Sequence, residues 1–206
     1  MDIALMFNGL TVGLAIAAPV GPIGVLCIRR TLTQGKIAGL VSGLGAATAD
    51  GIYGCIAGFG LTVISTLLVE QQTLLRVVGG LFLCYLGWQT FRSSPSKTSA
   101  KIKDTNCWSA YGSTVFLTLT NPLTILSFTA IFAGLGATEI QNNYGLAFLF
   151  VLSVFLGSAL WWAILVTTVG LFQNQINSRH LSWINRISGV ILVAFGIIAL
   201  SSAIVT

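Results

Sequence analysis

The sequence predicts an all-α, polytopic membrane protein with six transmembrane helices. Its 206 residues are 55% hydrophobic and only 7% charged, whereas an average soluble domain carries roughly 25% charged residues. Apolar runs long enough to cross about 30 Å of hydrocarbon recur along the chain, separated by short polar stretches. Residues 1–206 are therefore expected to form a single transmembrane domain.

The expected spans form two sets of three. Residues from about 92 to 110 contain the only stretch typical of a linker, polar and with a proline. Because three is odd, the two sets would enter the membrane from opposite sides. This is the inverted-topology 3+3 repeat that is common among secondary transporters. The spans are expected at about residues 3–28, 37–69 and 74–91, within 3–91, and at 111–134, 144–172 and 184–204, within 111–204.

The basic residues predict the orientation of these spans. Nine of the ten Lys and Arg residues, Arg29 and Arg30 among them, fall in the expected loops after spans one, three and five. Only Arg76 falls on the other side. Because cytoplasmic loops are rich in Lys and Arg, both termini are expected outside the cytoplasm. Nucleic-acid binders carry basic residues on an exposed patch instead, so no nucleic-acid partner is expected.

Two expected spans contain motifs that interrupt a helix. Span one carries Pro19, Gly21 and Pro22, and span four carries Asn121 and Pro122. Proline removes a backbone donor and clashes with the preceding turn, although prolines are also simply common in membrane helices. Interruptions at matching positions of two halves point to the substrate site of a transporter. These five residues are therefore candidates for a site at membrane depth.

Asp50 is the acidic residue expected inside a span, near the middle of span two. A charged Asp at the centre of a membrane helix costs roughly 2.5 to 3.5 kcal/mol, so this side chain should be protonated, paired or facing a wet cavity. It could carry a proton or neutralise the ammonium group of a substrate. The alternative is a protonated Asp that serves only as a structural hydrogen-bonding group.

Trp161 and Trp162 lie deep in span five, away from the membrane interfaces where tryptophan is enriched. Adjacent helical residues point in different directions, so at most one of them should face a cavity. Trp161 is the candidate for a cation–π contact with an ammonium group, and bundle packing is the alternative. Span two is rich in glycine at the spacing that lets helices approach closely. The glycine pairs are Gly39 with Gly43 and Gly54 with Gly58.

The chain resembles the LysE family of amino-acid exporters (the LysE/RhtB type). The matching residues are the 19–22 motif, Arg29 with Arg30, the glycine-flanked Asp50, and Asn121 with Pro122. The resemblance implies a secondary transporter that exports amino acids or their derivatives across a bacterial inner membrane by proton antiport. It places the broken segment, Asp50 and the Asn121 region along the translocation path.

One departure from the family limits what the resemblance implies. Many RhtB-type members have Lys after the Asn-Pro pair of span four, where this chain has Leu123. The identity of the substrate therefore cannot be carried over. The sequence also leaves open whether the chain acts alone or as a homodimer.

Two other classes of function fit the sequence less well than amino-acid export. A divalent-metal-cation exporter of the wider superfamily would need several converging carboxylate, His or Cys ligands, and the spans supply one acid. An enzyme would need a nucleophile with its base, a His/Glu group or a CxxC pair. The four cysteines have no such spacing. We therefore expect no enzymatic activity, no cofactor and no metal site.

Overall fold

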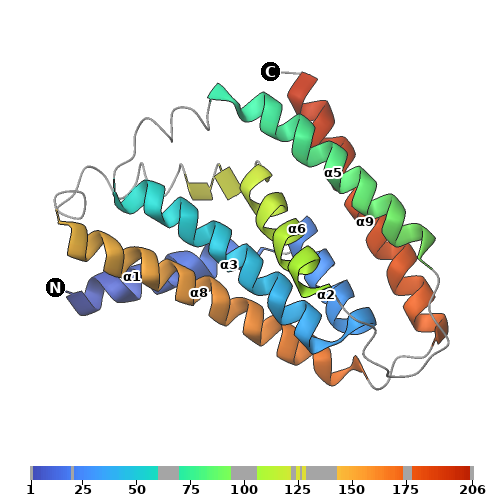
Figure 1. Ribbon diagram of the computed structural model, residues 1–206, viewed down its shortest axis with the longest axis horizontal. Helices are drawn as coiled ribbons and strands as arrows, with labels where there is room; N and C mark the ends of the chain where they lie inside the picture. Colours follow the sequence, from blue (N-terminus) through green and yellow to red (C-terminus); the bar gives the residue numbers. More distant parts are fainter. Residues whose placement is uncertain are drawn as a thin grey trace.

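The computed structural model describes residues 2–19, 21–59, 70–93, 106–121, 124–125, 127–128, 143–173 and 178–204. Within these residues it contains helices and no strands, so the predicted all-α class is confirmed (Figure 1). The long helices are α1 (Asp2–Ala17), α2 (Pro22–Gln34), α3 (Lys36–Gly58), α5 (Gln72–Arg92), α6 (Cys107–Thr120), α8 (Tyr144–Leu171) and α9 (Ser178–Ile204).

Three of the described helices, α5, α8 and α9, are long and apolar enough to cross a membrane. The bent pair α1 and α2 makes a fourth candidate if it counts as one span. This agrees with a polytopic membrane protein. The expected second and fourth spans run partly outside the described residues, at 60–69 and 129–134, as does most of the expected linker. Helix α6 begins at Cys107, so the end of that linker is helical.

The expected first span is two helices that meet at an angle of 80°. Helix α1 ends at Ala17 and α2 begins at Pro22, so the predicted interruption lies where the proline motif placed it. Pro22 is the first residue of α2, a position where its missing N–H would have no helical partner in any case. Gly35, with φ of +103°, then makes a one-residue turn into α3.

The expected loop around Arg29 and Arg30 is wrong, because both residues lie within α2. The apolar run of the first span ends near Ile28, but the helix that restarts at Pro22 continues to Gln34. A span that is broken at its middle needs a second half of its own. The basic pair therefore lies within that second half-helix.

The helices form two groups joined by α2 and α6 (Figure 1). Helices α1 and α3 both pack along α8, and α6 packs on α3. Helices α5 and α9 pack against each other. Helix α2 contacts α3, α8 and α9, and α6 contacts α5 as well as α3. The short half-helix α2 thus lies at the centre of the molecule.

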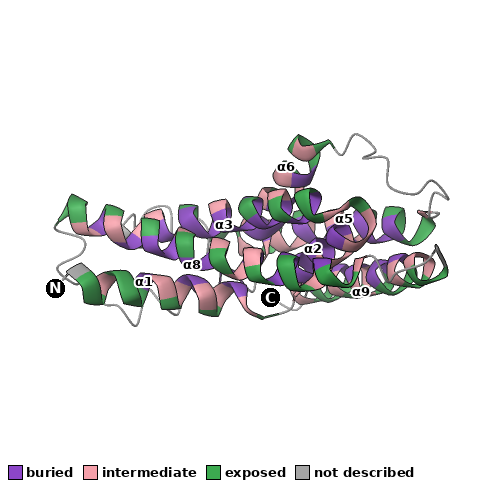
Figure 2. Cartoon of the chain, turned by 90° about the horizontal axis from the view of Figure 1, so that it is seen from below, coloured by how far each residue is buried: buried purple, intermediate pink, exposed green. Residues whose placement is uncertain are grey.

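Many large apolar side chains of the long helices are exposed. Figure 2 shows exposed residues on the outer faces of the helices and buried residues between them. Helix α8 exposes Leu152, Leu156, Leu160 and Ile164, which recur every four residues along one face. A helix that is apolar on its outer as well as its inner face is typical of a membrane span. These faces are suited to lipid.

Glycines let α5 and α9 approach closely. A Cβ atom added at Gly87 would lie 2.8 Å from the carbonyl oxygen of Gly189, and one added at Gly189 would lie 2.8 Å from that of Gly87. Two helical turns away, Gly80 and Gly196 face each other in the same way. A Cβ added at Gly80 would lie 3.0 Å from the Gly196 carbonyl oxygen, and one added at Gly196 would lie 2.8 Å from that of Gly80. Small residues at such contacts let the two backbones meet.

We expect Gly87→Ala to destabilise the protein, because its Cβ would meet the backbone of α9, which cannot move aside cheaply. Overpacking of this kind costs about 1–3 kcal/mol. The matched control is Gly112→Ala on α6, where an added Cβ meets nothing within 4 Å. There alanine should gain up to about 1 kcal/mol from helix propensity. Thermal unfolding of both variants in detergent measures the difference, and equal stability would contradict the close contact.

Candidate functional site

Asp50 lies on α3 where that helix packs against α8. Its side chain is buried, with 2% of its surface exposed. The Ser158 hydroxyl of α8 donates a hydrogen bond of 2.6 Å to the Asp50 carboxyl oxygen Oδ2, and Ser158 is fully buried as well. The acid is therefore held by a polar partner from a distant part of the chain.

Ser158 also brings this pair next to the first broken helix. Gly13 of α1 packs against α8 so closely that an added Cβ would overlap the Val154 carbonyl and lie 2.9 Å from the Ser158 backbone nitrogen. Gly13 is one helical turn before Ala17, where α1 ends. Asp50 and Ser158 thus lie beside the final turns of α1.

Tyr53, one turn after Asp50 on α3, reaches the second interruption. Its hydroxyl donates a hydrogen bond of 2.6 Å to the carbonyl oxygen of Leu119, in the last turn of α6. The last carbonyls of a helix have no helical donor, so Tyr53 satisfies one of them. Residues 50 and 53 share a helix face. One face of α3 therefore carries Asp50 toward the first break and Tyr53 toward the second.

Helix α6 ends at Thr120, and Asn121 is extended with ψ of 114°. The residue before a proline is pushed toward this conformation by the proline ring. Asn121 donates from Nδ2 to the hydroxyl of Thr124 at 2.9 Å. The predicted interruption of α6 is therefore present, while Pro122 itself lies outside the described residues.

The predicted site residues are not all gathered around Asp50. Pro22 is buried, Gly21 is half-buried and Pro19 is exposed at the break between α1 and α2. Trp161 is partly buried at the edge of the main apolar cluster, whereas Trp162 is 5% exposed and lies within that cluster. Among the described residues, no hydrogen bond joins Asp50 to any of these side chains. Ser158 is the direct partner that the sequence did not reveal.

Arg30 is a second polar centre that the sequence did not reveal. Its guanidinium is buried and donates from Nη1 to the Ser42 and Thr114 hydroxyls at 2.8 and 2.9 Å and to the Ala110 carbonyl at 2.9 Å. Its Nη2 donates to the Ser113 hydroxyl at 2.7 Å. Arg30 therefore ties α2 to both α3 and α6.

The neighbouring Arg29 ties the other side of α2. Its Nε donates to the Asn185 side-chain oxygen at 3.0 Å, and its Nη2 donates to the Ser93 hydroxyl at 3.2 Å. Asn185 is on α9, and Ser93 follows the end of α5. The sequence feature that could have placed Arg29 and Arg30 in a helix is Pro22, because a helix that begins there has both arginines about two turns further along.

Among the described residues, no three His, Cys, Asp or Glu side chains gather where they could hold a metal ion. Cys27, Cys55, Cys84 and Cys107 are not joined in disulfides. The site described above therefore consists of the Asp50 carboxyl group with the Ser158 hydroxyl as its hydrogen-bond partner.

Comparison with known proteins identifies the family. Residues 14–203 match the LysE type translocator family. The chain is 28% identical to the Bacillus subtilis protein named "Putative amino acid efflux protein YcgF", over 95% of this chain and 94% of that protein. It is 24% identical to the threonine efflux protein of Salmonella typhi, over 89% and 90% of the two chains. No solved structure matches. The match over nearly the whole chain shows that the protein belongs to the LysE type translocator family.

Proposed function

We propose that this protein exports amino acids or their derivatives from the bacterial cytoplasm by proton antiport. The observation that carries the proposal is the buried pair of Asp50 and Ser158, which lies between helices next to two interrupted helices. Family membership supports translocation, and two similar proteins are named for amino-acid or threonine efflux.

Asp50 fits both steps that such an antiporter needs. As a carboxylate it accepts a hydrogen bond from the Ser158 hydroxyl and can attract a substrate ammonium group. As a neutral acid it can donate to the same hydroxyl oxygen, because a serine hydroxyl is both donor and acceptor. One partner therefore satisfies both protonation states. Loss of the proton makes the site attractive to an ammonium group, and its return favours release.

We also propose the six-span, 3+3 inverted repeat, with both termini outside the cytoplasm. In such a repeat, α1, α3 and α5 of the first half would correspond to α6, α8 and α9 of the second. The contact between α1 and α8 would then correspond to the contact between α6 and α3, and both contacts occur. The pairs α3 with α8 and α5 with α9 would map onto themselves. The exposed apolar faces can meet lipid or a second copy, so the proposal holds for a monomer and for a homodimer.

Export from reconstituted vesicles tests the proposal. Liposomes that contain the purified protein are loaded with each labelled L-amino acid in turn, and a proton gradient is imposed. They should release at least one amino acid faster than equally loaded liposomes without protein. Collapse of the gradient with a protonophore should remove the difference. If no amino acid is released and Mn²⁺ or Cd²⁺ is, the protein is a metal exporter and the proposal is wrong.

A further inference from the structure

Arg30 is a buried cation whose described partners are all neutral. Only 7% of its surface is exposed, and its guanidinium donates to three hydroxyls and one carbonyl. Each of these hydroxyls donates its own proton to a carbonyl of its own helix, so toward Arg30 it acts as an acceptor. No carboxylate in the described part of the chain pairs with Arg30. Because buried charges in proteins are usually paired, this guanidinium favours an anion beside it.

One edge of the guanidinium carries N–H groups without acceptors. Arginine has five side-chain N–H groups. The two on Nη1 have three acceptors, and one of the two on Nη2 has the Ser113 hydroxyl. Because Nη1 and Nη2 donate to the adjacent residues Thr114 and Ser113, helix α6 lies along the edge between them. The N–H of Nε and the second N–H of Nη2 form the next edge, and neither has an acceptor among the described residues.

Solvent reaches part of this edge. The Nε atom of Arg30 has no hydrogen-bond partner in the described part of the chain, yet it is not one of the fully enclosed polar atoms there. Ser113, which contacts Nη2, is half-buried, and Ser109, one turn before it, is exposed. The guanidinium thus lies near the end of the molecule where α2 ends and α3 and α6 begin. In the proposed orientation this end faces the cytoplasm.

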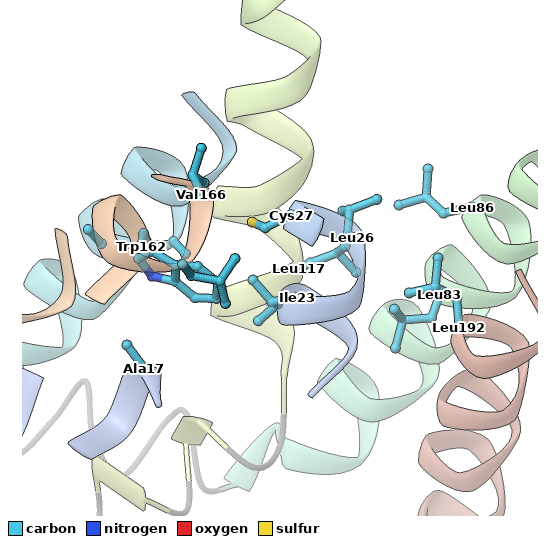
Figure 3. Close-up of a cluster of buried hydrophobic side chains, with 13 residues drawn as sticks. Ala17, Ile23, Leu26, Cys27, Leu83, Leu86, Leu117, Trp162, Val166 and Leu192 are labelled. Atoms are coloured by element: carbon cyan, nitrogen blue, oxygen red, sulfur yellow. The ribbon is translucent and has the colours of Figure 1, made fainter. Parts of the chain in front are cut away.

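The turn of α2 that precedes Arg30 is packed among apolar side chains. Cys27, three residues before Arg30, lies in the main apolar cluster together with Leu117 of α6 (Figure 3). A charged contact beside such a cluster is electrostatically stronger than one in water. The neighbouring Arg29 also donates only to neutral oxygens among the described residues. Two positive charges without a described acid therefore attract an anion to this part of α2.

We propose that the edge of Arg30 formed by Nε and Nη2 binds the carboxylate of the exported amino acid, at a site separate from Asp50. Two parallel N–H donors of a guanidinium match the two oxygens of a carboxylate. Ser42, a partner of Arg30, is eight residues before Asp50 on α3. That separation is about 12 Å along a helix, too far for the carboxylate and ammonium of one α-amino acid to reach both sites. Arg30 therefore captures the substrate before Asp50 binds it, and this assignment rests on the proposed export of amino acids.

The main test compares an amino acid with its amide. The α-carboxamide of the best-exported L-amino acid keeps the shape of the amino acid and lacks the carboxylate charge. Loaded into proteoliposomes together with the labelled amino acid, it should compete roughly tenfold more weakly than the unlabelled amino acid does, as expected for hydrogen bonds to a charged group. In Arg30→Lys, which lacks the bidentate fork, this preference should fall several-fold. In the control Arg29→Lys it should be unchanged.

A second pair of variants leaves Arg30 in place. Ser113→Asp puts a carboxylate at the residue that already accepts from Nη2 at 2.7 Å, so the guanidinium is occupied from within the protein. Ser113→Asn has the same shape without the charge. The KM for the amino acid should rise several-fold more in Ser113→Asp than in Ser113→Asn, whereas the unfolding midpoint of Ser113→Asp should be no lower. Equal KM values would overturn the assignment, even if Arg30→Lys failed to fold.

The outcomes separate the carboxylate site from the proposed function. If the amino acid is exported and Arg30→Lys keeps the full preference for the amino acid over its amide, the carboxylate site is wrong and amino-acid export stands. Arg30 then acts only by holding α2 in place. If the unmodified protein exports none of the L-amino acids, both fall.

Discussion

Asp50→Asn should abolish proton-driven efflux, so that release falls to the level of loaded liposomes without protein. The amide has nearly the shape of the carboxyl, and its oxygen can still accept a hydrogen bond from the Ser158 hydroxyl, so the contact between α3 and α8 is kept. What the amide lacks is a titratable proton and a negative charge. It also removes the cost of roughly 2.5 to 3.5 kcal/mol that a charged Asp imposes at a membrane helix centre. The variant should therefore be folded and inactive.

The loss must be separated from misfolding. Size-exclusion profiles of Asp50→Asn should match those of the unmodified protein, and its unfolding midpoint should be no lower. Ser158→Ala is the matched control, because it removes the hydroxyl partner and keeps the acid. It should retain gradient-driven efflux at a reduced rate. Undiminished gradient-driven efflux in Asp50→Asn would refute the coupling role of Asp50 and leave it as a structural hydrogen-bonding group.

The sequence predicts the features that depend on local chemistry. The interruption between Ala17 and Pro22 follows from the geometry of proline, and so does the end of α6 before Pro122. The burial of Asp50 follows from its place in an apolar run. These predictions need only the residue and its neighbours in the chain. The glycines of span two also lie at helix contacts, for example Gly43 against Trp162.

The partners of these residues could not be predicted. Ser158 is 108 positions from Asp50, and Arg30 is 80 to 84 positions from Ala110, Ser113 and Thr114. Such pairs depend on how helices pack, and no periodicity in a single sequence specifies that. Arg30 was misplaced for a second reason. The length of an apolar run predicts where a straight helix would leave the membrane. A broken span continues its second half-helix into residues beyond the apolar run, and Arg30 is one of these.

Replacement of Arg30 should have the largest effect on stability. Arg30 is 7% exposed, and its guanidinium makes four hydrogen bonds to neutral oxygens of α3 and α6. Hydrogen bonds to a charged group contribute about 1.5–3 kcal/mol each, but bonds within one network do not add. Arg30→Gln should therefore lower the free energy of unfolding by roughly 3–5 kcal/mol, a loss similar to that of breaking a buried ion pair.

Arg30→Lys distinguishes charge from geometry. Lysine keeps the charge, but one ammonium cannot reach oxygens that the guanidinium contacts from two separate nitrogens. Its stability should lie between those of Arg30→Gln and the unmodified protein.

The neighbouring Arg29→Lys is the control, because Arg29 is only partly buried and donates to two side chains, Asn185 and Ser93. Its loss should be smaller than that of Arg30→Lys. Unfolding midpoints in detergent measure all three variants, and an Arg30→Gln protein as stable as the original would show that α2 is held by its apolar face alone. The position of α2 also sets the helix terminus at the break. Efflux by Arg30→Lys should therefore fall even at temperatures where the variant remains folded.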